Sequence, residues 1–381
     1  MFGLHANKVY TGEGLLEDSV VLFQDGKIHS FVKPKTLPKG VRVFNYSKDI
    51  LVPGFIDIQI NGGAGVLFNE SIQRESLKAI SKAHLNYGTT SFLPTLITSH
   101  KSELIESIEC VNTVFKTDMS EDDTILGLHL EGPFLNTIKK GIHNEKHMRA
   151  LEGEDLKILK MLKSPVKLIT LAPEVNDLKS VKQLQDIGFK VFCGHSNASY
   201  EDLMPFLEKK ALHGVTHIFN ACSQIKARDP GVVGAGLLED SLYVSLIADG
   251  HHIHNRLLDL LFKIKNLKKI LLVSDAMPPS CSKVKKPFKL NGEDIFVKDG
   301  RCVNSKGVLS GAALSLLECL QYLNKNFSMN LEDSLRMTSS NQADALGLKD
   351  RGYLKSGYSA DFVVLSKTLA LKAVFKKGNL I

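Results

Sequence analysis

Three side chains of metal-binding type follow three apolar segments in the middle of the chain. Glu131 directly follows the segment 125–130, His195 comes shortly after the segment 190–193, and His217 lies within the segment 214–219. Two imidazoles and one carboxylate are the ligand set of a catalytic zinc site, which keeps a fourth position open for water. The sequence therefore predicts one divalent metal ion per chain, with Zn²⁺ as the expected ion.

Asp275 follows another apolar segment, 269–273. A carboxylate that is not a metal ligand can accept the proton of an attacking water molecule and act as a general base. We therefore interpret Asp275 as the acid/base of a hydrolytic site. The alternative is that Asp275 only caps the segment that follows it.

Further polar residues lie close to these candidates in the sequence. His143, in the glycine-containing loop 139–144, is of a type that can polarise a carbonyl group, and its alternative is a solvated loop position. Arg228 can hold an anion with its planar guanidinium, or it can pair with Asp229. A last group is predicted to support the ligands from behind, with a core position as the alternative for the histidine: Gln59, Asn61 and His129.

Eight β-rich apolar segments alternate with spans that are able to hold a helix. They cover residues 55–60, 90–94, 125–130, 167–171, 190–193, 214–219, 243–248 and 269–273. Alternation along a strand places His129 and Glu131 on one face, and likewise Cys193 and His195. Eight strand and helix units with right-handed crossovers predict an α/β protein, a (β/α)8 TIM-type barrel. An open doubly wound sheet is the alternative.

Both ends of the chain have a different, all-β character. Short strands are expected at 3–10, 19–24, 27–32 and 41–44, and again at 361–365 and 371–376, after helices at 309–324 and 331–345. The two ends are therefore expected to pair into one small β-sandwich. The predicted domains are this sandwich, 1–52 with 348–381, and the barrel, 53–347.

The composition restricts the class of protein. With 43% hydrophobic and 23% charged residues, the 381-residue chain is typical of a globular protein, and no apolar run reaches the roughly 18 residues of a membrane-spanning helix. The net charge of +7 comes without dense basic blocks, so no nucleic-acid partner is expected. Six widely spaced cysteines and the absence of a secretory signal favour reduced thiols and a cytoplasmic location.

Several motifs resemble the amidohydrolase superfamily. The segments 51–57 and 357–365 are similar to the entry and exit signatures of that superfamily. Its N-acetylglucosamine-6-phosphate deacetylases are resembled, in order, by the internal motifs 127–134, 140–144, 194–198, 216–221, 248–252, 273–276 and 309–311. The resemblance implies a barrel with a small β-sandwich, a homodimer, and hydrolysis of the acetamide of N-acetylglucosamine 6-phosphate to glucosamine 6-phosphate and acetate, in amino-sugar catabolism.

The resemblance also implies roles for single residues. Glu131, His195 and His217 match the metal ligands, Asp275 matches the acid/base, and His143 matches the residue that polarises the acetamide carbonyl. Arg228 and His252 are implied to reach the phosphate of the ligand in the neighbouring subunit. The remaining matches to substrate-binding positions are Ile142, Asn220, Ala221, Asp249, Leu309, Ser310 and Gly311.

Two departures from the superfamily pattern concern the metal. Many members carry His-x-His at the end of the first strand, where this chain has Gln59 and Asn61, and amides are poor zinc ligands. The fourth strand ends, at 171–174, without a lysine for a bridging carbamate, so a single ion is expected. Two alternatives to the deacetylase remain: an amidohydrolase acting on another amide, such as a cyclic amide or a nucleobase, and a barrel without catalysis.

Overall fold

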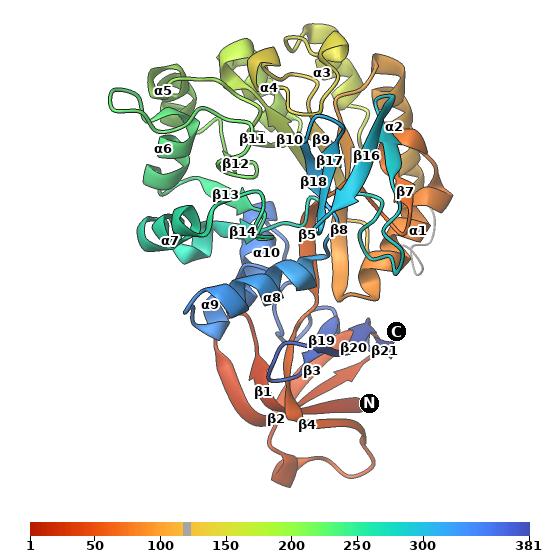
Figure 1. Ribbon diagram of the computed structural model, residues 1–381. Helices are drawn as coiled ribbons and strands as arrows, with labels where there is room; N and C mark the ends of the chain where they lie inside the picture. The colour runs from red at the N-terminus through yellow and green to blue at the C-terminus, as the bar shows by residue number, and fades with distance from the viewer. Residues whose placement is uncertain (117–122) are drawn as a thin grey trace.

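Eight parallel strands form the centre of the protein in the computed structural model, which describes residues 1–116 and 123–381 (Figure 1). Each strand pairs with the next one along the chain, and a parallel bridge between Ile60 and Ala276 joins the last strand region to the first. This bridge closes the sheet, so the barrel prediction is confirmed and the open sheet is wrong. The strands are β5 (Phe55–Ile60), β8 (Thr89–Ile97), β9 (Gly127–Glu131), β10 (Val166–Leu171), β11 (Lys190–Cys193), β12 (Gly214–Val215), β13 (Tyr243–Leu246) and β14 (Ile270–Leu272).

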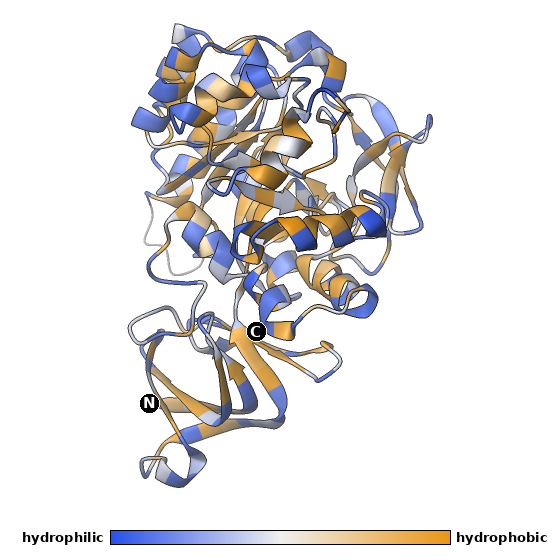
Figure 2. Cartoon of the chain, turned by 90° about the vertical axis from the view of Figure 1, so that its left-hand side faces the viewer, coloured by the Kyte–Doolittle hydropathy of each residue, from blue (hydrophilic) through white to orange (hydrophobic). Residues whose placement is uncertain are grey.

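Helices cover the outside of this barrel. In Figure 2 most of these helices carry apolar residues along one side and polar residues along the other, as expected for helices between a core and solvent. Helix α6 is the exception, because it consists of apolar residues and glycine. The helices are α1 (Arg74–Leu85), α2 (Lys101–Val114), α3 (Gly153–Leu159), α4 (Leu178–Asp186), α5 (Tyr200–Glu208), α6 (Gly231–Leu238), α7 (Asn255–Ile264), α8 (Leu316–Asn326), α9 (Leu331–Arg336) and α10 (Ser340–Leu346).

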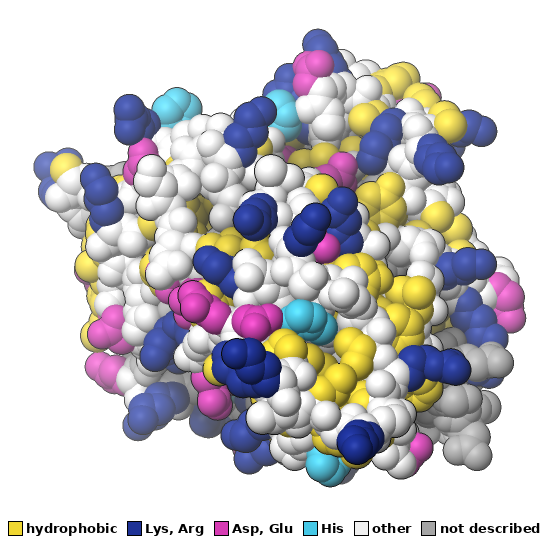
Figure 3. All heavy atoms as spheres, turned by 90° about the horizontal axis from the view of Figure 1, so that it is seen from below, with side chains coloured by type: hydrophobic (Ala, Val, Ile, Leu, Met, Phe, Trp, Pro, Cys, Tyr) yellow, Lys and Arg dark blue, Asp and Glu magenta, His cyan; other side chains and the backbone are white. Residues whose placement is uncertain are grey.

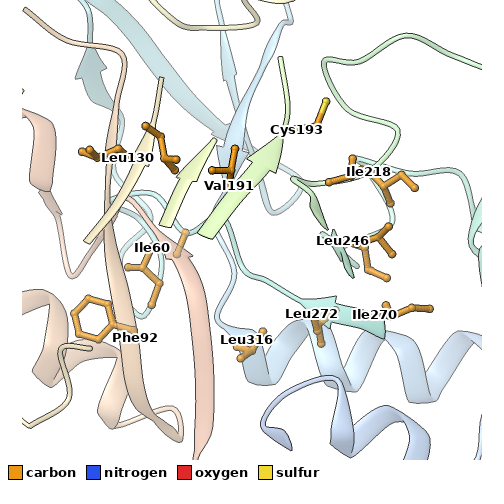
Figure 4. Packing of buried hydrophobic residues seen from close by; sticks show 14 of the residues in the cluster. Ile60, Phe92, Leu130, Val191, Cys193, Ile218, Leu246, Ile270, Leu272 and Leu316 are labelled. Atoms are coloured by element: carbon orange, nitrogen blue, oxygen red, sulfur yellow. The ribbon is translucent and has the colours of Figure 1, made fainter. Parts of the chain in front are cut away.

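Alternating residues of the strands pack on opposite sides of the barrel wall. Leu130, Val191 and Cys193 belong to the large cluster between the strands and the helices (Figure 4), whereas Phe192 belongs to a second cluster. The expectation that Cys193 shares a face with His195 is therefore wrong. Strand β11 ends at Cys193, and the chain turns before it reaches the histidine.

The region after β14 differs most from the expectation. Residues 309–312 form a strand, not the start of a helix, because they complete a four-stranded antiparallel sheet that was not predicted. The expected helix 331–345 is two helices, α9 and α10, which are separated at residues 337–339. The strands of the additional sheet are β15 (Phe288–Leu290), β16 (Glu293–Lys298), β17 (Arg301–Asn304) and β18 (Leu309–Ala312), and a two-stranded sheet joins β6 (Gly62–Gly63) to β7 (Val66–Leu67).

Strands from both termini join in one seven-stranded sheet below the barrel in Figure 1. The sheet folds over on itself, since the rings of Phe23 and Phe362, on strands that are not neighbours, lie 5.4 Å apart edge to face. The expected pairing of the two ends is confirmed. The strands are β1 (Phe2–Tyr10), β2 (Leu15–Gln24), β3 (Lys27–Val32), β4 (Arg42–Pro53), β19 (Phe362–Leu365), β20 (Leu371–Lys376) and β21 (Asn379–Leu380).

The surface and the cysteines can be described for the same part of the chain. Figure 3 shows Lys and Arg side chains scattered among acidic ones over the face seen from below, not gathered in a stripe. All six cysteines are free thiols. Within the described residues, no helix is both long and apolar enough to cross a bilayer.

Candidate active site

Glu131, His195 and His217 converge at the end of the barrel to which the carboxyl ends of the strands point. Their ligand atoms all lie within 4.8 Å of one another. Nε2 of His217 is 2.8 Å and Nε2 of His195 is 3.3 Å from Oε1 of Glu131. All three side chains are at most 6% exposed. The structure therefore brings together the three ligands that the sequence predicts.

Backbone conformation brings these side chains together. His195, His217 and Asp275 all have positive φ angles, of 48°, 29° and 48°. Each lies beyond the last hydrogen-bonded residue of its strand, where the left-handed conformation redirects the side chain. Such strained backbone clusters at functional sites, where the surrounding structure holds it in place. The expected strand 214–219 is thus wrong beyond Val215, although its histidine does reach the site.

The contacts of the trio fit a divalent cation. Nδ1 of His195 donates to the carbonyl oxygen of Lys139 at 2.8 Å, so in the neutral ring Nε2 carries a lone pair. This lone pair faces the carboxylate of Glu131, a repulsive arrangement that a cation between the two groups would make favourable. The site also leaves Nδ1 of His217 buried without a hydrogen-bond partner among the described residues.

His143 lies beside the trio, with its ring centroid 4.3 Å from that of His195. The backbone N–H of Thr98 donates to Nδ1 of His143, so the proton of the neutral ring is on Nε2. Burial, together with the neighbouring His195, lowers the pKa of His143 to about 3. His143 therefore presents a neutral N–H donor to the site, as polarisation of a carbonyl oxygen requires.

Asp275 is fixed on two sides. Its Oδ1 accepts a hydrogen bond from Nδ2 of Asn61 at 2.7 Å. Gly311, with φ of +74°, approaches from the other side, where an added Cβ would lie 2.9 Å from the Asp275 carbonyl oxygen. Burial and the nearby charge of Glu131 raise the pKa of Asp275 to about 6. The carboxyl is therefore able to exchange protons near neutral pH.

Two predicted supporting residues lie behind the trio. Nε2 of Gln59 donates to Oε1 of Glu131 at 3.1 Å. His129 is buried and bonded through Nε2 to the hydroxyl of Thr170 at 2.8 Å. Burial lowers the pKa of His129 to about 4, so it is a neutral part of the barrel interior and does not line the pocket.

The trio, His143 and Asp275 line one pocket of about 490 Å³. Other expected residues that line it are Asn61, Ile142, Asn220, Ala221, His252, Leu309 and Gly311. The sequence did not indicate a role for the other lining residues, which are Ile97, Ile138, Lys139, Gly141, Ile247, Met277, Gly307 and Val308. Lys139 was missed because the loop 139–144 was considered only for His143. Gly307 and Val308 were missed because they belong to the β17–β18 turn, which was not predicted.

Three expected substrate contacts do not line this pocket. Ser310 is buried beside it, and its hydroxyl donates to the carbonyl of Val308. Asp249 is buried behind His252, whose Nδ1 it binds at 2.6 Å. Burial by itself raises the pKa of Asp249, but the hydrogen bond and charge of His252, together with the backbone N–H groups of His251 and His252, outweigh it and lower the pKa.

Arg228 is the third of these residues and is exposed in the loop before α6. Among the described residues it makes no ion pair, and Asp229 instead accepts hydrogen bonds from the backbone of Tyr200 and Gly231. Pairing between Arg228 and Asp229 is therefore wrong. The guanidinium is free to contact another molecule.

A family model described as the amidohydrolase family matches residues 50–381, which include the whole barrel. The chain belongs to the amidohydrolase family. The barrel with its terminal sheet is thus the fold of an amidohydrolase, as the motifs predict, and the trio is its candidate metal site.

Relatives and solved structures narrow the comparison within the amidohydrolases. The chain is 30% identical to N-acetylglucosamine-6-phosphate deacetylase of Haemophilus influenzae over 94% of this chain and 93% of that protein. It is equally similar, at 30% over 89% and 84%, to N-acetylgalactosamine-6-phosphate deacetylase of a Shewanella strain. The crystal structure of N-acetylglucosamine-6-phosphate deacetylase from Pasteurella multocida superposes with a TM-score of 0.94 at 30% identity, covering 100% of this chain and 99% of that one.

Proposed function

We propose that this amidohydrolase hydrolyses the acetamide of N-acetylglucosamine 6-phosphate to glucosamine 6-phosphate and acetate, as a step in amino-sugar catabolism. The observation that carries the proposal is the placement of Glu131, His195 and His217 in one pocket with His143 and Asp275. That pocket offers a cation site, a neutral donor and a carboxyl with a raised pKa. The names of the relatives supply the substrate class.

The reaction requires a bond from water oxygen to the carbonyl carbon and cleavage of the C–N bond. Asp275 accepts the proton that the attacking water loses and delivers it to the departing amine nitrogen. The Nε2–H of His143 donates to the carbonyl oxygen and stabilises the negative charge that develops there. One carboxyl and one imidazole thus serve both halves of the reaction.

Glu131, His195 and His217 would hold a single divalent ion, which we expect to be Zn²⁺. When bound, such an ion supplies Lewis acidity, which polarises a carbonyl and lowers the pKa of water toward about 7. Gln59 holds the carboxylate of Glu131 from behind, and Lys139 fixes the ring of His195 through its carbonyl. The chain's own contribution is therefore the orientation of the three ligands.

The test is acetate release by the purified, metal-loaded protein. We expect turnover of N-acetylglucosamine 6-phosphate and at least hundredfold lower kcat/KM for N-acetylglucosamine without the phosphate. No acetate from any N-acetylhexosamine phosphate would disprove the function. Because one relative carries the galacto name, N-acetylgalactosamine 6-phosphate belongs in the same series, and preference for it would correct the sugar and keep the chemistry.

We also propose a homodimer in which Arg228 contacts the phosphate bound to the neighbouring subunit. His252, which the resemblance assigns to the same contact, instead lines the pocket of its own chain. Arg228 is exposed and lies outside the pocket of its own chain, as a contribution to another chain requires. Mixing Arg228→Ala with the inactive Asp275→Asn variant tests this. In hybrid dimers the Arg228→Ala subunit keeps its own base and receives arginine from its partner, so part of the low KM should return. No recovery in confirmed hybrids would exclude an arginine supplied in trans.

The remaining assignments are also proposals. We infer a cytoplasmic location from the reduced thiols and the metabolic substrate. We propose domain boundaries that assign 1–52 and 348–381 to the terminal sheet and 53–347 to the barrel. Ile142, Asn220, Ala221, Leu309 and Gly311 are proposed to bind the sugar phosphate. Asp249 is proposed to support His252, and Ser310 to support Val308 in the lining.

A further inference from the structure

Three of the four polar atoms of Asn61 form hydrogen bonds with other residues of the barrel. Its backbone N–H donates to the carbonyl oxygen of Ala276 at 2.9 Å, and its own carbonyl accepts from the N–H of Phe68 at 2.9 Å. Its side-chain Nδ2 donates to Oδ1 of Asp275 at 2.7 Å. The residue is 1% exposed. Asn61 is therefore held rigidly across the closure of the barrel.

The remaining polar atom, Oδ1 of Asn61, is buried and has no hydrogen-bond partner in the described part of the chain. The orientation of this amide is determined by its neighbour, because the reverse orientation would place two oxygens 2.7 Å apart at Asp275. A buried carbonyl oxygen without a donor is rare in folded proteins and calls for a ligand or water that satisfies it. Asn61 also lines the pocket, so a molecule bound there can supply that donor.

We propose that Asn61 is a specificity-determining residue, whose Oδ1 accepts a hydrogen bond from the N–H of the scissile amide while its Nδ2 holds Asp275. The inference rests on the proposed deacetylase function and adds the recognition of the nitrogen. The N–H is the one donor that an acetamide group carries. This hydrogen is attached to the nitrogen that Asp275 must protonate. The side chain of Asn61 would therefore position both the proton donor, Asp275, and the proton acceptor, the amide nitrogen.

This arrangement has a stereochemical consequence. When water adds to the carbonyl carbon, the nitrogen becomes pyramidal and acquires a lone pair. An N–H held on Oδ1 of Asn61 restricts rotation about the C–N bond and turns this lone pair toward Asp275, which is joined to the same amide. The proton is then delivered to nitrogen without a rearrangement of the bound intermediate.

The arrangement also selects amides over esters. An ester oxygen has no hydrogen to donate, and its lone pairs would face the lone pairs of Oδ1. A site that is built to bond a substrate N–H discriminates strongly against the analogue that lacks it, because its own polar group is then left unpaired. Gln59, the amide two residues earlier at the end of β5, donates instead to Glu131 and has no such role.

The experiment compares two substrates with three proteins. The substrates are N-acetylglucosamine 6-phosphate and 2-O-acetylglucose 6-phosphate, in which oxygen replaces the nitrogen. The proteins are the wild type, Asn61→Leu and the matched control Gln59→Leu, each checked for metal content and folding. We expect Asn61→Leu to lower kcat/KM for the amide at least tenfold more than for the ester. Gln59→Leu should lower both by the same factor, since it acts through the metal ligand.

Equal losses on amide and ester in Asn61→Leu would overturn the inference and leave Asn61 as a support for Asp275 only. If Asn61→Leu fails to fold or to hold metal, Asn61→Ala is measured against the same tenfold criterion, because alanine removes the acceptor without adding an apolar branch. Failure of the proposed function is distinct, since the wild type would then hydrolyse neither substrate. An active wild type with an unchanged substrate ratio in both variants refutes only the role of Asn61.

Discussion

Gln59 is joined to Glu131 by a hydrogen bond of 3.1 Å from Nε2 to Oε1. The side-chain nitrogen of Gln59 therefore orients the carboxylate of Glu131, a predicted metal ligand. Because this nitrogen is a hydrogen-bond donor, it is not itself a metal ligand. This contact supports the expectation of a single ion, with glutamine orienting the ligand.

Replacement of Gln59 by leucine should weaken metal binding. The carboxylate of Glu131 would lose the donor that fixes its orientation, and the loss of such a partner costs roughly 10–100-fold in metal affinity. Competition against a chelator of known affinity measures the change. Gln321→Leu is the matched control, because Nε2 of Gln321 bonds the carbonyl of Leu369, away from the pocket. Equal affinities in the two variants would exclude Gln59 from this role.

Asp275→Asn should abolish most turnover and keep the metal. The amide cannot accept the proton of water, and general-base contributions of about 10²–10⁴ are typical, so we expect kcat to fall by about a thousandfold. Single-turnover assays and metal analysis of the same preparation measure both quantities. Asp186→Asn, on the exposed end of α4, is the control and should behave as the wild type. Substantial activity in Asp275→Asn would assign the base to another residue.

The acid limb of the pH profile should report Asp275. Burial and Glu131 raise its pKa to about 6, and only the ionised form can accept a proton. As the pH falls below the pKa, the ionised fraction and kcat/KM fall tenfold per pH unit. A cation at the trio attracts the carboxylate and moves this limb to lower pH. A limb centred above pH 7 in the metal-loaded protein would contradict the assignment.

His143→Ala should lower kcat more than it raises KM. The Nε2–H of His143 is expected to stabilise charge that is present only in the transition state, and loss of one such donor costs about 10²–10³ in kcat. Steady-state kinetics separate the two parameters. His147→Ala, four residues along the same loop region and outside the pocket, is the control. A change confined to KM would make His143 a binding residue.

Asp57→Asn should stabilise the fold at high pH more than at low pH. Asp57 is buried, and burial raises its pKa to about 7 from the ordinary 3.8. The folded state therefore binds this proton more tightly, so its contribution to stability is present below the unfolded pKa and is lost as the pH rises through about 7. Asparagine stays neutral, and its advantage should grow by about 2 kcal/mol between pH 5 and 8.

Urea unfolding of Asp57→Asn and of the wild type at the two pH values measures this difference. Asp259→Asn, on the solvent side of α7, is the control, because that carboxylate is partly exposed and only pairs with Arg256. A pH-independent difference between the Asp57 variant and the wild type would mean that the carboxyl is ionised in the folded protein across this range.

Local patterns determined the barrel and most of the site. Apolar segments of strand length that alternate with helix-length spans leave a parallel sheet as the simplest solution, and its strand ends collect Glu131, His143, His195, His217 and Asp275. Glu131, His195, His217 and Asp275 could be predicted because each lies in or shortly after its own strand in the sequence, whereas His143 lies in the long loop after β9. For these four residues, the local sequence is sufficient to predict the position at the end of the barrel.

Contacts between distant segments decided the rest. Pairing with β17 makes Leu309–Ala312 a strand, and that partner is not visible in the local sequence. Positive φ angles at His195 and His217 depend on neighbouring strands that hold them, so simple alternation misplaced Cys193. The bond from Asn61 to Asp275 spans 214 residues and forms only when the barrel closes. The sequence by itself therefore determined the candidate metal ligands and, besides them, His143 and Asp275. The tertiary structure decided which other side chains line the pocket and how they are oriented, because both depend on contacts made only in the closed fold.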